Sequence, residues 1–398
     1  MFSKVIINPM AAASLSLPPE IELHDFLRLC LNSRRHPTDL EAARSMSGDL
    51  DWQGILAYAS SRYVAPTLYS SLKGSGILPA EIETALHSIY LETAQRNLLQ
   101  ANALKKLLET FSQQGIEAML LKGLALAVPV YGDVAARPSR DIDLLLQAED
   151  LPKALPLAEV LGYLRYDVPE HAHTDLEFEN EIILFRAADG MNIDLHWSPF
   201  DSPFYQRRLD MEWFWSQSLQ FRLSGTAIRT LAPESNLIYL SGHLLLHHGG
   251  DELLWSNDIA ELLFRFSTGL DWNMILDKAK EFRLVLPLQH VLRRLAREWH
   301  APIPDWLLEA LESTPVSQEE RRVFNSLSGE RQAAGEHFLS DIRYLETWGK
   351  RFRYILQLVF PTRKYMQHRY KIPHSWLVPL YYPYRWWLGL RSIFQPRK

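Results

Sequence analysis

Two acidic side chains stand inside the hydrophobic segment RDIDLLL, residues 140–146 of a chain of 398 residues. The leucines and isoleucine of this segment are typical of a buried β-strand. Because side chains alternate across a strand, Asp141 and Asp143 share one face and lie a few ångströms apart. Two like charges that close are unfavourable without a cation between them. Magnesium suits this position, because it prefers oxygen ligands and keeps coordination sites for substrate phosphates.

A third carboxylate occurs in a second predicted strand, Met191–Trp197. Asp194 stands there between two hydrophobic residues, and His196 shares its face. We expect this strand to lie beside residues 140–146, so that three carboxylates converge on one metal centre. The alternative for Asp194 is a buried acid that is hydrogen-bonded to His196 or to the backbone.

Basic residues precede the acidic strand. Lys122 and Gly123 end a predicted strand and open a predicted helix, where backbone N–H groups can hold a phosphate. Glycine allows close backbone approach, and Lys122 can reach a phosphate oxygen. Arg137 and Arg140 are candidates to offset the charge of a triphosphate. The alternatives are an exposed lysine at the end of a strand and two arginines that balance the carboxylates of residues 140–146.

The periodicity of the chain predicts an α+β fold, with a small mixed-sheet core between helical regions. Residues 1–115 are expected to be helical, with a helix at Trp52–Lys73 and a long one from Ala80 to Gln114. The core spans residues 116–200, and its expected strands are Ala118–Lys122, Arg140–Leu146, Tyr163–Asp167, Leu176–Ala187 and Met191–Trp197. Residues 201–316 are expected to form a helical domain that completes the cleft. Residues 317–398 are expected to be helical and then basic and rich in aromatic residues.

Three motifs in this order resemble a known family. LLKG at residues 120–123, RPSRDIDLL at 137–145 and IDLHW at 193–197 resemble the uncharacterised bacterial nucleotidyltransferases of the DNA polymerase β superfamily. The motifs lie within residues 118–200, and softer similarity extends to residues 231–259 and 361–370. The chain departs from the Gly-Gly or Gly-Ser turn of that superfamily, because Leu124 follows the glycine.

The resemblance implies transfer of a nucleoside monophosphate from an NTP, expected to be ATP, to an acceptor hydroxyl with release of pyrophosphate. The three carboxylates would bind two Mg²⁺ ions, with Mn²⁺ as the alternative metal, and Asp194 would help to remove the acceptor proton. Lys122, Gly123, Arg137 and Arg140 would bind the nucleotide. The sequence does not identify the acceptor. A second hypothesis, motivated by Leu124, is a catalytically idle module that binds a nucleotide or a partner.

Two histidines and an aspartate downstream are weaker candidates. His243 and His247 are four residues apart on a predicted helix, and Asp258 follows them. That spacing can bind zinc, but the glutamate of the H-E-x-x-H motif is missing here. We expect these residues, together with His196, to line the cleft opposite the metals or to pack in a polar core.

The C-terminal residues carry a charge unlike that of the rest of the chain. Residues 347–398 hold 11 Lys and Arg, 13 aromatic residues and no acid, whereas residues 1–346 hold 31 basic and 47 acidic side chains, a net charge of −16. Three interpretations are open: contact with RNA, contact with a membrane surface, or a structural clamp that neutralises the acidic body with its aromatic residues in the core. We favour the clamp.

The remaining sequence features indicate the cellular compartment of the protein. A single cysteine, Cys30, excludes a disulfide framework and predicts no disulfide-linked partner. The first 17 residues lack the apolar centre of a signal peptide. No uncharged apolar run reaches the roughly 18 residues that span a bilayer. We expect a cytoplasmic protein, and the membrane interpretation of residues 347–398 would make it peripheral to the inner membrane.

Overall fold

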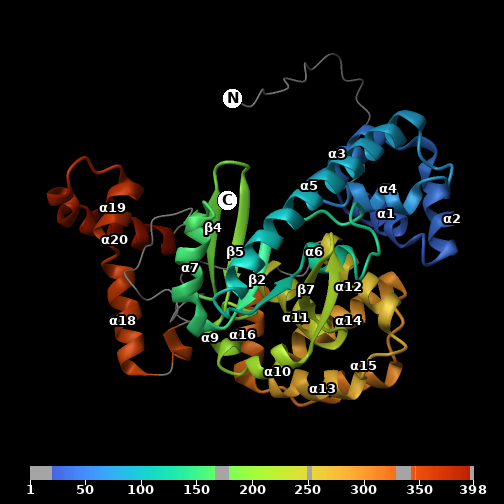
Figure 1. Ribbon diagram of the computed structural model, residues 1–398. Coiled ribbons are helices and arrows are strands. Elements are labelled where there is room, and N and C mark those ends of the chain that lie inside the picture. The colour runs from blue at the N-terminus through green and yellow to red at the C-terminus, as the bar shows by residue number, and fades with distance from the viewer. Residues whose placement is uncertain (1–19, 166–178, 249–252, 329–341, 346, 395–398) are drawn as a thin grey trace. The chain divides into compact units, whose positions relative to one another are not determined.

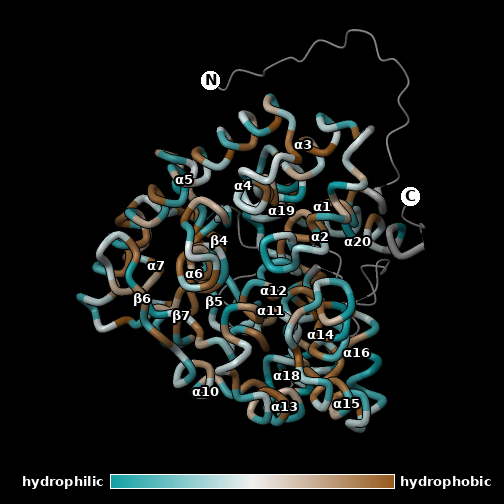
Figure 2. The backbone as a smooth tube through the Cα atoms, turned by 90° about the vertical axis from the view of Figure 1, so that its right-hand side faces the viewer, coloured by the Kyte–Doolittle hydropathy of each residue, from teal (hydrophilic) through white to brown (hydrophobic). Residues whose placement is uncertain are grey.

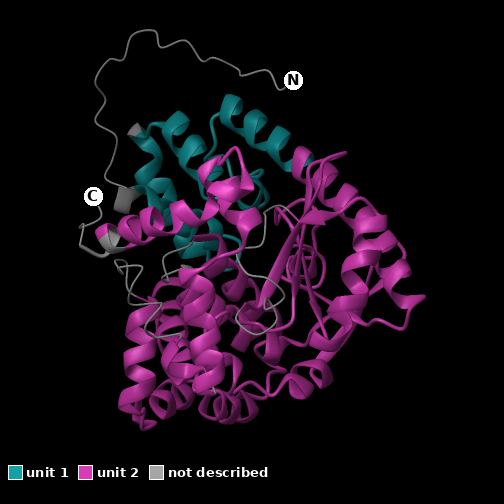
Figure 3. Cartoon of the chain, turned by 90° about the vertical axis from the view of Figure 1, so that its left-hand side faces the viewer, with its two compact units in different colours: residues 1–91 teal, residues 92–398 magenta. Residues whose placement is uncertain are grey.

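The computed structural model describes residues 20–165, 179–248, 253–328, 342–345 and 347–394. The predicted mixed architecture is confirmed, because helices surround a single seven-stranded sheet (Figure 1). The chain divides into two compact units, residues 1–91 and 92–398 (Figure 3). The finer division into four segments stays a prediction. Residues 166–167 and 176–178 of two expected strands lie outside the described residues, as do the first 17 residues.

The first unit is helical. Its elements are α1 (Glu20–Asn32), α2 (Pro37–Met46), the 3₁₀ turn η1 (Ser47–Asp49), α3 (Trp52–Ser61), α4 (Ala65–Leu72) and the start of α5 (Ala80–Ser112). The sequence predicted one helix over Trp52–Lys73, but two form. Tyr63 takes a left-handed conformation with φ 58°, which no helix continues, and Pro66 sits in the first turn of α4.

The seven strands run in the order β3-β4-β5-β2-β1-β7-β6. They are β1 (Ala118–Leu121), β2 (Ile142–Leu146), β3 (Leu164–Arg165), β4 (Glu181–Arg186), β5 (Met191–His196), β6 (Ser218–Leu223) and β7 (Thr226–Leu231). The central strand β2 pairs antiparallel with β1 and parallel with β5. Strands β6 and β7 lie where helices were expected. They form a hairpin around Ser224 and Gly225, both at positive φ, and β7 extends the sheet by pairing with β1.

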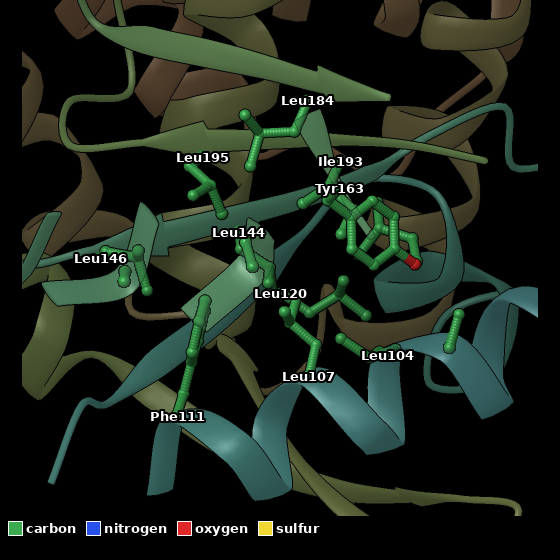
Figure 4. Packing of buried hydrophobic residues seen from close by; sticks show 14 of the residues in the cluster. Leu104, Leu107, Phe111, Leu120, Leu144, Leu146, Tyr163, Leu184, Ile193 and Leu195 are labelled. Carbon is green, nitrogen blue, oxygen red and sulfur yellow. The ribbon is translucent and has the colours of Figure 1, made fainter. Parts of the chain in front are cut away.

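One face of the sheet carries the hydrophobic core of the second unit. Leu104, Leu107 and Phe111 of α5 pack there against alternate residues of three strands (Figure 4), namely Leu120, Leu144, Leu146, Ile193 and Leu195. Burying a leucine side chain contributes about 1.5–3 kcal/mol, so this face fixes the sheet firmly on α5. Because residues alternate along a strand, the side chains between these leucines point to the opposite face.

Helices fill the remainder of the second unit. They are α6 (Leu124–Ala127), η2 (Ala148–Asp150), α7 (Leu151–Val160), α9 (Pro203–Gln206), α10 (Met211–Ser216), α11 (Pro233–His248), α12 (Leu253–Phe266), α13 (Trp272–Glu281), α14 (Val285–Trp299), α15 (Asp305–Ser313) and α16 (Gln318–Ser328). Hydrophobic and hydrophilic residues alternate along many of them (Figure 2), as in helices that bury one face. The helices α11 and α12 pack against each other and, as described below, contribute side chains to the candidate site.

The C-terminal helices are α18 (Trp348–Val359), α19 (Arg363–Tyr370), η3 (Ser375–Leu377) and α20 (Val378–Phe394). A small cluster of Met366, Ile372 and Val378 holds the last three together. The clamp interpretation placed the aromatic residues of this region in the core. Trp348 and Trp376 are instead 82% and 71% exposed, so the structure does not support the clamp.

Among the described helices, none combines the length and the apolar character that a membrane-spanning helix requires.

Candidate metal and nucleotide site

The register of the sheet brings the predicted acidic residues together. Asp143 on β2 lies directly opposite Asp194 on β5. His196, two residues further along β5, shares the face of Asp194. The expectation that these two strands are neighbours is therefore confirmed. Asp141 precedes the first residue of β2 and is partly exposed.

Asp143, Asp194 and His196 form a cluster with the geometry of metal ligands. One ligand atom from each residue lies within 4.8 Å of the others. His196 Nε2 is hydrogen-bonded to Asp143 Oδ1 at 3.0 Å, whereas Nδ1 lies 3.1 Å from Glu181 Oε2 without the geometry of a hydrogen bond. A carboxylate that is hydrogen-bonded to an imidazole sets the orientation of the ring. Asp141 is not in this cluster, and its role as a metal ligand stays a prediction.

A buried lysine neutralises one of the carboxylates. Lys122 Nζ lies 2.9 Å from Asp143 Oδ1, and the lysine side chain is only 11% exposed. It is therefore not the exposed strand-end lysine of the alternative interpretation. Burial alone would lower the pKa of Lys122, but Asp143, Tyr239 and Asp141 together outweigh burial and raise this pKa above its ordinary value. Burial alone would raise the pKa of Asp143, whereas Lys122 and His196 bring it down to about 2.

Asp194 has no comparable compensation. Its Oδ1 is buried and has no hydrogen-bond partner among the described residues. Burial, followed by the negative charges of Asp143 and Asp141, raises the pKa of Asp194 to about 7. Burial and Asp143 also raise the pKa of Asp141. Leaving a buried polar group without a partner costs about 1–3 kcal/mol, and more for a charge, so a positively charged ligand would be stabilised here.

The charges and donor atoms of this cluster fit a divalent cation. When ionised, Asp143 and Asp194 carry two negative charges, of which Lys122 balances one, and Asp141 adds a negative charge nearby. This excess of negative charge favours a bound cation. Carboxylate oxygens suit Mg²⁺ and Mn²⁺, and the imidazole of His196 also suits Zn²⁺, so these ligands favour a metal without selecting one.

The turn after β1 brings its backbone close to the loop that precedes β2. Gly123 has a φ of 40°, and a Cβ at this position would collide with Ser139 Oγ. Only glycine fits both the conformation and the space. Asn97 of α5 fixes the facing loop: its side-chain amide donates to the carbonyls of Val134 and Arg137 at 2.6 and 2.8 Å, and its Oδ1 accepts from the Ser139 N–H at 3.1 Å.

Arg137 is bound by Asp258, a partner that the sequence did not suggest. Its Nη2 and Nε lie 2.7 and 3.2 Å from the two oxygens of Asp258, which makes the pair bidentate. Tyr131 donates to the same carboxylate at 2.6 Å, and Asn257 donates to the tyrosine oxygen at 2.9 Å. Both charged side chains are at least 95% buried. The proposed phosphate contact of Arg137 is untested and stays a prediction.

Aromatic side chains of α11 and α12 surround Lys122. Trp255 lies beneath both cations, with its ring centre 5.6 Å from Lys122 Nζ and 5.9 Å from the Arg137 guanidinium carbon. His243 contacts Trp255 and His247, at ring separations of 4.5 and 4.9 Å. Burial lowers the pKa of His247. The two histidines thus belong to an aromatic stack beside the cluster, and sequence spacing did not reveal Trp255 as the centre of that stack.

Arg140 is exposed and lies at a separate hollow. With Arg96 and Asp189 it lines a pocket of about 360 Å³ between α5 and the turn that joins β4 to β5. Arg96 also donates to the Arg140 carbonyl at 3.2 Å. The predicted nucleotide contact of Arg140 stays a prediction.

Comparisons with known proteins agree with the motifs of the sheet. The family model described as "Uncharacterised nucleotidyltransferase" matches residues 48–300. No protein with a curated description matches. An antigenic nucleotidyltransferase-like protein from Paracoccidioides brasiliensis matches at 15% identity, over 57% of this chain and 94% of its own, but its TM-score of 0.31 is too low to carry an argument. The family match spans well over half of the sequence, and the chain therefore belongs to this family of uncharacterised nucleotidyltransferases.

Proposed function

We propose that this protein transfers a nucleoside monophosphate from an NTP, with ATP as the expected donor, to an acceptor hydroxyl. The acceptor oxygen forms a bond to the α-phosphorus, the bond between the α- and β-phosphates breaks, and pyrophosphate leaves. The observation that carries the proposal is the excess negative charge at Asp143 and Asp194, on the sheet face opposite the hydrophobic core. A carboxylate pair of which Lys122 neutralises only one member is suited to a divalent metal.

Each residue of the cluster has a distinct part. Asp143 and Asp194, with His196 or Asp141, would hold the metal. A bound divalent ion would make the acceptor hydroxyl more acidic and stabilise the charge of the departing pyrophosphate. Asp194 would help to remove the acceptor proton, because its Oδ1 has no hydrogen-bond partner among the described residues.

The basic residues would position the nucleotide. Lys122 neutralises Asp143 in the described structure, and a metal at Asp143 would compete with this ion pair and release the ammonium group toward a phosphate. Gly123 lets the turn after β1 pack against Ser139 of the loop before β2, and its backbone N–H is the proposed phosphate contact. Positioning and charge stabilisation supply most of the catalysis in phosphoryl transfer. The combined placement of these residues therefore matters more than any single contact.

One observation favours the second hypothesis, an idle binding module. Lys122 and Arg137 already have carboxylate partners, at 2.9 and 2.7 Å, and both are buried. A site whose cations are satisfied internally could bind a nucleotide without turning it over. The two hypotheses differ in whether pyrophosphate is released.

The experiment measures pyrophosphate release and label transfer from α-labelled NTPs with Mg²⁺ or Mn²⁺, across a panel of sugars, peptides, RNA and small metabolites. We expect turnover by the unmodified chain and a loss of about 10³-fold in Asp194→Asn. Asp277→Asn is the matched control, because Asp277 is 76% exposed on α13. Metal-dependent NTP binding without release of pyrophosphate across the panel would favour the binding module.

A further inference from the structure

The helices of residues 347–394, here called the basic tail, expose an unusual amount of hydrophobic surface. Nineteen large hydrophobic residues are exposed in the described chain, and nine of them are scattered between residues 46 and 306. The other ten belong to the basic tail: Trp348, Phe352, Ile355, Leu356, Phe360, Trp376, Leu380, Tyr384, Trp386 and Trp387. A large exposed apolar patch marks an interaction site more often than single exposed residues do.

The exposed residues of α18 fall on one side of the helix. At about 100° per residue, Trp348, Phe352, Ile355 and Leu356 lie within an arc of about 100°. Lys350 and Arg353 lie outside this arc, whereas Arg351 borders it. No residue of α18 is fully buried, and Trp348 and Phe352 are 82% and 66% exposed, so much of the apolar face is open in the described structure. An apolar face opposite a basic one is typical of helices that lie in a membrane interface.

The last helix, α20, also exposes hydrophobic residues along one side. Leu380, Tyr384 and Trp387 follow one another at i, i+4 and i+7 on α20, and they are 68%, 49% and 53% exposed. Val378 instead enters the small cluster with Met366. The Trp386 indole N–H donates to the Val359 carbonyl at 2.8 Å and so ties α20 to the end of α18. The two apolar faces therefore belong to one folded segment.

The charge of the basic tail specifies the kind of surface that it fits. Residues 347–394 contain nine Lys and Arg and no acidic residue. Two arginines stand beside exposed tryptophans: the guanidinium carbon of Arg351 lies 5.0 Å from the Trp348 ring centre, and that of Arg391 lies 5.4 Å from the ring of Trp387. An amphipathic ring next to a cation suits the headgroup level of a bilayer, where one end of the pair is apolar and the other is wet.

We propose that the basic tail binds the surface of an anionic lipid bilayer, with the apolar faces of α18 and α20 inserted between headgroups. RNA is the less favoured partner. Bases stack on aromatic rings, but the aliphatic residues Ile355, Leu356 and Leu380 gain nothing from stacking and need an apolar phase. The proposal does not depend on the nucleotidyltransferase activity, because none of these residues belongs to the cluster of Asp143, Asp194 and His196.

The test is sedimentation of the full chain with vesicles of phosphatidylcholine, with and without phosphatidylserine. We expect sedimentation with the anionic vesicles only, and weaker sedimentation at high salt. The double variant Trp348→Ser, Phe352→Ser removes part of the apolar face and should lower partitioning by about tenfold or more. Trp306→Ser is the matched control, because Trp306 is also exposed, at 44%, but lies outside the basic tail.

The outcomes separate the two partners. All the substituted residues are exposed, so the melting temperature should not change, and circular dichroism checks this. Absence of sedimentation with anionic vesicles would overturn the proposal. So would equal sedimentation of the double variant and the unmodified chain. Salt-sensitive binding of single-stranded RNA in a chain that ignores vesicles would assign the basic tail to nucleic acid instead.

Discussion

Two buried acidic groups in the second unit differ in how their charge is balanced. Asp258 meets Arg137 in a bidentate pair, and a tyrosine donates a further hydrogen bond to the same carboxylate. Asp194 faces Asp143 across two strands, its Oδ1 has no partner, and its pKa is raised to about 7. One carboxylate is saturated by the protein, whereas the other is held beside a like charge.

This difference is the one expected between a structural carboxylate and a carboxylate that binds a cation. A buried ion pair with complete hydrogen bonding holds two elements together, here the loop before β2 and helix α12. A buried carboxylate beside another carboxylate destabilises the fold unless something positive joins it. The sequence ranked Asp194 above Asp258 as a candidate, but it showed the counter-charge of neither.

The largest effect is expected from breaking the Arg137–Asp258 ion pair. Asp258→Asn leaves the Arg137 guanidinium buried without a counter-charge, and we expect the free energy of unfolding to fall by about 3–5 kcal/mol. Urea denaturation followed by tryptophan fluorescence measures this. The double variant Arg137→Met, Asp258→Leu should recover most of the loss, because no charge then stays buried. A loss below about 1 kcal/mol, as expected for an exposed pair, would show that the network is not structural.

The saturated pair also shows what sequence could not predict. The strand at residues 140–146 and the pairing of Asp143 with Asp194 follow from alternation and from one neighbouring strand, which are local properties. Arg137 and Asp258 are 121 residues apart, and only the packing of α12 joins them. The burial of Lys122 likewise depends on Trp255, far along the chain. A lysine at a strand end is normally exposed, so the sequence left the environment of this one open.

The missed hairpin had a signal in the sequence. Ser224 and Gly225 follow a six-residue segment, SLQFRL, in which hydrophobic residues alternate with polar ones, and a turn at Ser-Gly after such a segment is a mark of a β-hairpin. The segments before and after the hairpin are helical, so the whole of residues 201–316 was predicted to be helical. The metal-ligating cluster was predicted in part: Asp143 and Asp194 meet, and His196, expected only to line the cleft, joins them.

The next largest effect is expected at Asp194, the carboxylate without a counter-charge. Asp194→Asn should lower the affinity for Mg²⁺ by about 10–100-fold, because one of the charged ligands is lost. Calorimetry on the nucleotide-free protein measures this without reference to turnover. Asp277→Asn should bind Mg²⁺ as the unmodified chain does. Equal Mg²⁺ affinities in all three proteins would mean that Asp194 is not a metal ligand and that the metal site lies elsewhere.

The smallest effect is a dependence of stability on pH in the metal-free protein. Asp194 has a pKa of about 7 when folded, against 3.8 ordinarily, so between these values the folded state holds a proton that the unfolded state has lost. Its stabilising contribution is complete below pH 4 and disappears as the pH rises through 7. Asp143 is ionised throughout this range, since its folded pKa is about 2. Glu320, raised to about 7 by burial, adds a slope of the same sign, so the unmodified chain must be compared with a variant.

That comparison uses melting temperatures of the unmodified chain and Asp194→Asn between pH 5 and pH 8, in the presence of a chelator. Asp194→Asn should gain about 2–4 °C relative to the unmodified chain as the pH rises, because its amide never ionises beside Asp143. Added Mg²⁺ should close the gap at high pH, since the ion compensates the same charge that the amide removes. A gap that does not depend on pH would mean that the Asp194 carboxylate is already neutralised by the protein, as Asp258 is, and would remove the reason to place a cation at this site.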